Sequence, residues 1–145
     1  MTAAVKMRQK LAWDESFSVG VSRFDDQHKV LFEYLNELYD AMRDKSEKEV
    51  VGKVLNKLTD YTLNHFLEEE VELSKSGYPG YLKHKEAHDK LVAAVREYHV
   101  RFHVGRETGR KMLIEIIAVL TDWLMEHIRI ADKDYGMFLN SKGIR

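Results

Sequence analysis

The chain has 145 residues, of which 44% are hydrophobic and 32% charged, and its 23 basic and 24 acidic side chains leave a net charge of −1. These values favour one domain with a substantial core, and they argue against a nucleic-acid partner or a membrane-embedded protein, because the chain has no basic stripe and no apolar run near the ~18 residues of a membrane span. Since the chain has no cysteine and no apolar signal core near its N-terminus, disulfides, thiolate metal sites and a cysteine nucleophile are excluded, and a cytoplasmic location is expected.

The N-terminal segment 1–22 carries aromatic and β-branched residues without a helical period, and it is expected to form an extended arm packed across the domain. A helix is predicted over 23–44, where apolar residues recur at steps of three and four. His28 lies within that buried stripe. A single proline and eight glycines leave little material for a many-turned β architecture, which favours an all-α fold.

Three more helices are predicted, over 46–76, 79–103 and 107–131. The first of these would begin with a capping box formed by Ser46 and Glu49 and would stop at Gly77. Residues after 131 are expected to form a short C-terminal segment. Because short connections join the four helices, we predict an antiparallel up-and-down four-helix bundle that forms one domain over residues 1–145.

Five histidines and two acidic residues fall on the inward faces of these helices at one height along the bundle. In antiparallel helices joined by short turns, residues equidistant from a turn lie beside each other. By this measure, one layer holds His28, His65, Glu69, His84, His88, His127 and Asp132. The second histidine pair on the third helix, His99 and His103, lies about 22 Å away along the axis, and these two are expected to be partly exposed residues near a helix end.

Local spacing selects the two acidic members of the layer. Glu69 follows His65 by four residues and so shares its helix face, whereas the neighbouring Glu68, Glu70 and Glu72 are expected to be surface charge. Asp132 follows His127 by five residues. The helix must therefore loosen there, widen into a π-type turn, or end.

A buried cluster of five imidazoles and two carboxylates would be costly without compensation, and a bound metal is the usual resolution. Seven protein ligands overfill one ion. Two ions could be held if both carboxylates and one hydroxide bridge them. Two six-coordinate ions would then have all their positions filled except one, on the ion with two histidines. Imidazole with carboxylate suits iron, with zinc, copper or nickel as alternatives.

Four motifs that contain these residues resemble those of the hemerythrins, specifically the single-domain bacteriohemerythrins: QHKVLF around His28, HFLEE at 65–69, GYPGYLKHKEAH ending at His88, and HIRIAD at 127–132. With WDESFSVGV at 13–21, the resemblance covers nearly the whole chain. It implies a non-haem di-iron centre. One iron would take His84, His88 and His127, the other His28 and His65, and Glu69, Asp132 and an oxo or hydroxo group would bridge them. Dioxygen would bind reversibly at the open position.

The expected function is reversible dioxygen binding for storage, transport or delivery, without substrate turnover and with an oxygen-consuming enzyme as a candidate recipient. A di-iron oxidase or peroxidase is the alternative, and oxygen or redox sensing is a third hypothesis. A dry apolar oxygen pocket is needed, and its candidate walls are Phe66, Trp123, Leu124 and Ile128. A line on the fourth helix, Ile114, Ala118, Thr121 and Met125, is a candidate gas route because two small residues lie at its middle.

Overall fold

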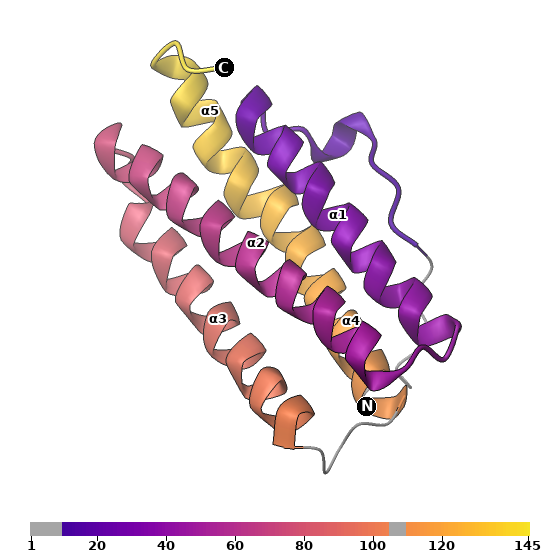
Figure 1. Cartoon of the computed structure of the whole chain (residues 1–145). Coiled ribbons are helices and arrows are strands. Elements are labelled where there is room, and N and C mark those ends of the chain that lie inside the picture. The colour runs from indigo at the N-terminus through magenta and orange to yellow at the C-terminus, as the bar shows by residue number, and fades with distance from the viewer. Residues whose placement is uncertain (1–9, 105–109) are drawn as a thin grey trace, which may run out of the picture.

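The computed structural model describes residues 10–104 and 110–145. The first nine residues of the expected arm, and the predicted start of the fourth helix at 107, lie outside the described residues. The bundle consists of α1 (Ser22–Arg43), α2 (Lys48–Lys75), α3 (Tyr81–Val104) and α4 (Arg110–His127) (Figure 1). No strand occurs in either described range, so the all-α prediction is confirmed. None of the helices described is long and apolar enough to cross a membrane.

The described part of the N-terminal arm is fixed to α1 by polar and aromatic contacts. The side-chain amide of Asn36 accepts a hydrogen bond from the Leu11 N–H at 2.7 Å and donates one to the Leu11 carbonyl at 2.8 Å. A short 3-10 turn, η1 (Glu15–Phe17), then buries Phe17 against Phe32, with ring centroids 5.0 Å apart. The described part of the arm therefore packs on the bundle, as predicted, and it does so through its aromatic side chains.

The turn between α1 and α2 differs from the predicted capping box. The Ser46 N–H donates to the Ala41 carbonyl at 2.9 Å, and Lys45 has a left-handed backbone with φ of 53°. These two features form a Schellman motif at the end of α1. The backbone N–H of Ser46 is therefore bonded to α1, and Ser46 lies before the N-cap of α2. Glu47 is the N-cap residue of α2 and makes no side-chain capping bond, so the prediction for Ser46 and Glu49 is wrong.

The second turn follows the prediction more closely. Gly77 has a φ of 74°, and the next N–H, that of Tyr78, donates to the Leu73 carbonyl at 3.0 Å. A left-handed residue at this position is commonly glycine because it has no Cβ to clash. Helix α3 begins at Tyr81, two residues after the predicted start.

The helix that carries His127 does not end at 131. It widens into a π-helical turn, η2 (Ile128–Asp132), and then continues as α5 (Lys133–Ser141). Of the three alternatives that the spacing of His127 and Asp132 left open, the structure adopts the π-type turn. The predicted short C-terminal segment is thus helical, and α5 lies along α1 beside the arm (Figure 1).

Candidate metal centre

The predicted layer forms at one level of the bundle, with contributions from every long helix. His28 comes from α1, His65 and Glu69 from α2, and His84 and His88 from α3, while His127 ends α4 and Asp132 ends η2. All seven side chains are buried, and Glu69 and His28 are 0% exposed. The helical stripes place these polar residues inward, so they must satisfy one another or a ligand.

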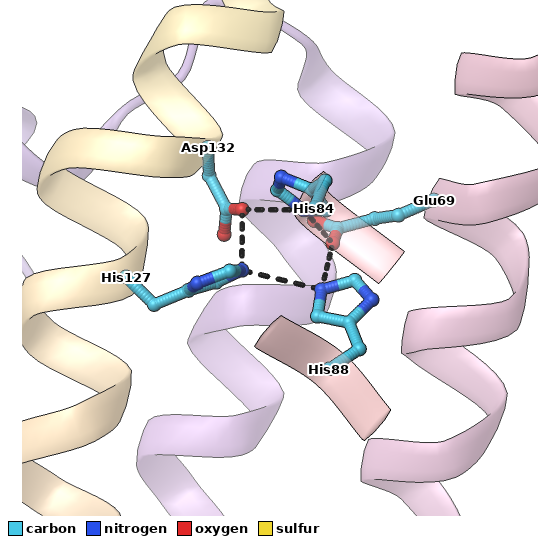
Figure 2. A group of neighbouring side chains, drawn as sticks. All are labelled: Glu69, His84, His88, His127 and Asp132. Carbon is cyan, nitrogen blue, oxygen red and sulfur yellow. Dashed lines mark hydrogen bonds and ion pairs between the residues drawn. The ribbon is translucent and has the colours of Figure 1, made fainter. Parts of the chain in front are cut away.

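Three of the histidines gather around one oxygen of each carboxylate (Figure 2). His84 Nε2 lies 3.3 Å from Glu69 Oε1 and 3.2 Å from Asp132 Oδ1. His88 Nε2 lies 3.2 Å from the same Glu69 oxygen, and His127 Nε2 lies 3.1 Å from the same Asp132 oxygen. We call this set the three-histidine group.

The other two histidines gather around the second oxygen of each carboxylate. His28 Nε2 lies 3.3 Å from Glu69 Oε2 and 3.1 Å from Asp132 Oδ2, and His65 Nε2 lies 3.1 Å from Glu69 Oε2. We call this set the two-histidine group. Each carboxylate therefore gives one oxygen to each group, so that Glu69 and Asp132 span the two.

The separations match those of atoms that surround a metal ion. Two ligand atoms about 2.1 Å from an ion and at right angles are roughly 3.0 Å apart, close to the 3.1–3.3 Å found here. Asp132 Oδ1 has no hydrogen-bond partner among the described residues although two ring nitrogens lie near it. Two of these pairs, His28 with Glu69 and His84 with Glu69, are also within hydrogen-bond distance. The convergence of five ring nitrogens on two carboxylates at these separations suits two ions.

The protonation of the metal-free cluster follows from its burial and charge. Burial disfavours the charged form of His28 and His84, but hydrogen bonds and charge from Asp132 and Glu69 outweigh it and raise the pKa of each to about 9. Burial would likewise raise the pKa of Glu69 and Asp132, yet the surrounding histidines hold both well below the usual range. A metal ion must therefore displace protons from this cluster.

Two of the histidines have their outward nitrogens held by residues that the sequence analysis did not select. His65 Nδ1 donates to Gln27 Oε1 at 2.6 Å, and the amide of Gln27 in turn donates to Glu68 at 2.8 Å. His88 Nδ1 donates to Glu70 at 2.8 Å. A proton on Nδ1 leaves Nε2 with an inward lone pair, as ligation requires. The interpretation of Glu70 as mere surface charge is therefore wrong.

Tyr135 is the third residue that the sequence analysis missed. Its side chain is fully buried, and its hydroxyl donates to Oε2 of Glu69. Burial, followed by the negative charge of Glu69 and Asp132, raises the pKa of Tyr135 well above its ordinary value, so the phenol keeps its proton and remains a donor. Its position three residues after Asp132, on the same helix face, is a sequence signal that could have identified it.

Aromatic rings cover two members of the three-histidine group. Phe66 is buried and stacks on His88 with ring centroids 3.7 Å apart and planes within 1°. Trp123 is half-buried and stacks on His127 at 4.2 Å and 15°. Phe66 also lies 6.0 Å from the His65 ring, centroid to centroid. The two aromatic rings thus cover one face of His88 and of His127, while each ring and its histidine also line a depression in the surface of the bundle.

A small apolar cavity lies inside the bundle next to this layer. Its volume is about 20 Å³. It is lined by Leu31, Leu35, Leu58, Thr59, Thr62, Leu91, Val95, Leu120 and Leu124. Leu124 is the only predicted pocket residue in this lining, although Ile128 is also buried, at 0% exposure. A void of this size can hold one small molecule, and its leucine lining favours an apolar one.

The four residues of the candidate gas route lie along α4, away from that cavity. Ala118 and Thr121 are buried, and Ile114 and Met125 are half-buried. None of the four belongs to the cavity lining. A route along this line would therefore approach the layer from a different side of α4 than the cavity does.

Comparison with known proteins identifies the family. The model of the hemerythrin HHE cation binding domain matches residues 19–139. Bacteriohemerythrins of Pseudomonas aeruginosa (strain LESB58) and Methylococcus capsulatus are each 37% identical over 125 residues, which is 86% of this chain and 78% and 92% of those proteins. Myohemerythrin of Sipunculus nudus is 31% identical over 123 residues, or 85% of this chain and 88% of that one. A crystal structure of wild-type hemerythrin superposes with a TM-score of 0.80 at 35% identity, covering 88% of this chain and 96% of that one.

The family match and the buried layer agree, because the matched residues include all seven side chains of the layer. This chain belongs to the hemerythrin family.

Proposed function

We propose that this protein binds dioxygen reversibly at a non-haem di-iron centre. The three-histidine group would hold one iron, the two-histidine group would hold the other, and Glu69 and Asp132 would bridge them. The single observation that carries the proposal is the division of each carboxylate, with one oxygen facing each histidine group at 3.1–3.3 Å. A lone ion would leave half of these oxygens without a partner.

The two groups have unequal numbers of histidines, and this difference determines which ion would have an open coordination position. A di-iron pair held by these residues would supply electrons for dioxygen and one open coordination position, on the side with fewer protein ligands. His28 and His65 define that side. Two carboxylates among five imidazoles make the set poorer in anions than the glutamate-rich di-iron sites of ferritin-like bundles. Fewer anionic ligands stabilise high-valent iron less, and this favours binding of oxygen over its activation.

The residues around the layer support binding without turnover because they limit access by water and protons. Phe66, Trp123, Leu124 and Ile128 would form the wall of the oxygen pocket. The buried phenol of Tyr135 is a hydrogen-bond donor already committed to Glu69, so it does not act as a free acid. Beyond the proposed ligands and the residues bonded to them, the described layer contains no spare acid or base for substrate chemistry.

The first test is to load the purified protein with ferrous iron without air, count the iron per chain, and record the visible spectrum as air is admitted and then removed with argon. We expect two irons per chain and an absorption band that appears with air and disappears with argon over repeated cycles. Replacement of the shared carboxylate in Glu69→Leu should remove both ions, whereas a variant outside the layer, such as Lys90→Gln, should keep both.

A different result would select the catalytic alternative. If the iron is oxidised once and does not return, while the protein repeatedly consumes an added reductant together with oxygen or peroxide, the protein is an oxidase or peroxidase. One iron per chain with Glu69 intact would contradict the two-ion centre itself. A role in storage, transport or delivery to an oxygen-consuming enzyme follows from the carrier result only together with a measured oxygen affinity.

A further inference from the structure

Two histidines near the end of α3 form a pair that the buried layer does not use. His99 is half-buried and His103 is exposed, which agrees with the sequence prediction. Because they are four residues apart, they share one helix face, and their ring centroids are 5.5 Å apart with planes tilted by 35°. At about 1.5 Å per residue, the pair lies roughly 22 Å from His84 and His88 along the helix.

The hydrogen bonds around His99 fix which of its nitrogens is free. The hydroxyl of Thr59 donates its only proton to the Leu55 carbonyl at 2.8 Å. The same hydroxyl lies 2.8 Å from His99 Nε2, so it must accept there, and Nε2 must carry the proton. The lone pair of His99 is then on Nδ1, where it can bind a metal ion.

The charge state of His99 suits the same role. Burial, and then the proximity of His103, lower the pKa of His99 below its ordinary value of 6.5. The imidazole is therefore neutral at physiological pH, the form that binds metal ions. A histidine that stabilises the C-terminal end of a helix must be positively charged, and this would require a raised pKa for His99.

The buried layer provides an internal comparison for the geometry. His84 and His88 have the same four-residue spacing on the same helix, with ring centroids 4.5 Å apart. An ion about 2.1 Å from a ring nitrogen is roughly 3.2 Å from that ring's centroid. Two rings at 5.5 Å can therefore share one ion, with roughly 120° between the two metal–nitrogen directions.

We propose that His99 and His103 form a second, solvent-facing site for a divalent transition metal ion of the copper, nickel or zinc class. In the ranges that the structure describes, no third histidine or acid joins the pair. Among these ions, Cu²⁺ binds nitrogen ligands most tightly. The site is independent of the buried centre, which has its own donors on other turns.

The test uses iron-loaded protein without a histidine tag, so that the buried layer is already filled. Cu²⁺ is titrated by calorimetry, and the bound ion is examined by electron paramagnetic resonance for coupling to nitrogen. We expect one Cu²⁺ per chain with nitrogen ligands. His99→Gln and His103→Gln should each weaken this binding at least tenfold and leave the iron per chain unchanged. Lys90→Gln, an exposed change on the same helix, is the matched control.

Thr59→Val tests the assignment of the nitrogens. It removes the acceptor that holds the Nε2 proton of His99 and leaves both imidazoles in place, so Cu²⁺ should bind severalfold more weakly than to the unchanged protein. Unaltered binding in this variant would overturn the assignment. If copper still binds with unchanged affinity after either histidine is replaced, the proposed site is overturned, whatever the iron count. If a variant changes the iron count but not copper binding, the variant has affected the buried centre, and the copper site proposed at these histidines is again overturned.

Discussion

Tyr135 donates its phenolic proton to Oε2 of Glu69, the same carboxylate oxygen that faces His28 and His65. The bond is fully buried and connects α5 to α2. Glu69 is thereby held at the height where it can face both histidine groups. Tyr135 is a positioning residue in this arrangement, and its removal should affect the centre through Glu69.

Tyr135→Phe keeps the ring and removes only the donor. We expect iron affinity to fall by about tenfold, which is the lower end of the range for loss of a group that orients a metal ligand. We also expect the metal-free protein to lose about 2 kcal/mol of unfolding free energy, because a buried hydrogen bond to a charged group is removed. Iron competition with a chelator and urea unfolding measure the two effects. Tyr78→Phe is the matched control, because it removes a phenol–carboxylate bond to Asp134 outside the layer. Equal iron affinities for both variants would contradict the role of Tyr135.

Glu70→Leu should release His88 by removing the acceptor for its Nδ1 proton. The inward lone pair of His88 would no longer be fixed, and we expect iron affinity to fall by about 10-fold to 100-fold. Glu70→Gln retains an oxygen that can accept the same hydrogen bond, so most of the affinity should be kept. If both replacements weaken iron binding equally, negative charge rather than orientation is the contribution of Glu70.

The stability of the metal-free protein should peak in mildly acidic solution. His28 and His84 have pKa values raised from 6.5 to about 9, so their contribution is complete below pH 6.5 and is lost as pH rises through 9. Glu69 and Asp132 have lowered pKa values, so their contribution is present above the ordinary values of 4.5 and 3.8 and is lost in stronger acid. Thermal unfolding in the presence of a chelator should therefore give the highest midpoint between about pH 5 and 6.5.

Iron loading should stabilise the protein most in the alkaline range, where the metal-free protein loses stability. Metal ions bind neutral imidazole and release the protons, so the gain in melting temperature on loading should increase from pH 6.5 to 9. A loaded protein that loses stability over this range as steeply as the metal-free one would show that iron is not bound by His28 and His84.

Gly136→Ala should strongly destabilise the protein because the arm passes directly over this position. A Cβ on Gly136 would lie 1.9 Å from the Val19 carbonyl oxygen, which is backbone and cannot rotate away. We expect a loss of about 3 kcal/mol or more of unfolding free energy. Met137→Ala, at the next position and on an exposed side chain, should change stability much less. Similar unfolding curves for the two variants would show that the arm is not packed against α5.

Ala118→Phe tests the candidate gas route on α4. If oxygen passes along the line of Ile114, Ala118, Thr121 and Met125, the larger ring should slow oxygen binding in stopped-flow experiments and leave the iron content unchanged. Val119→Phe adds a ring at the adjacent, exposed position and should leave the rate as it is. An unchanged rate in a folded Ala118→Phe protein would remove this route.

The helix stripes and the heights of the histidines allowed the bundle and the seven-residue layer to be predicted, because both depend on periodicity and on short connections. Gln27 and Glu70 could not be found in this way. Each is the sequence neighbour of a layer residue and lies about 100° away from it on the helix, so its contact with a histidine depends on how closely the next helix approaches. Ser46 was misjudged because the end of α1 and the start of α2 compete for the same residue.

The π turn at Ile128–Asp132 does more than bring Asp132 to His127. An α-helix advances about 100° per residue. If α4 continued without the turn, the buried positions of α5, Tyr135, Gly136 and Leu139, would point roughly 80° away from the buried face of α4. The extra residue in the turn cancels this rotation. The widened turn therefore sets the angular phase of the whole C-terminal helix. Winding the same residues as a regular α-helix would rotate α5 and turn Tyr135 away from Glu69 and Gly136 away from the arm in a single step.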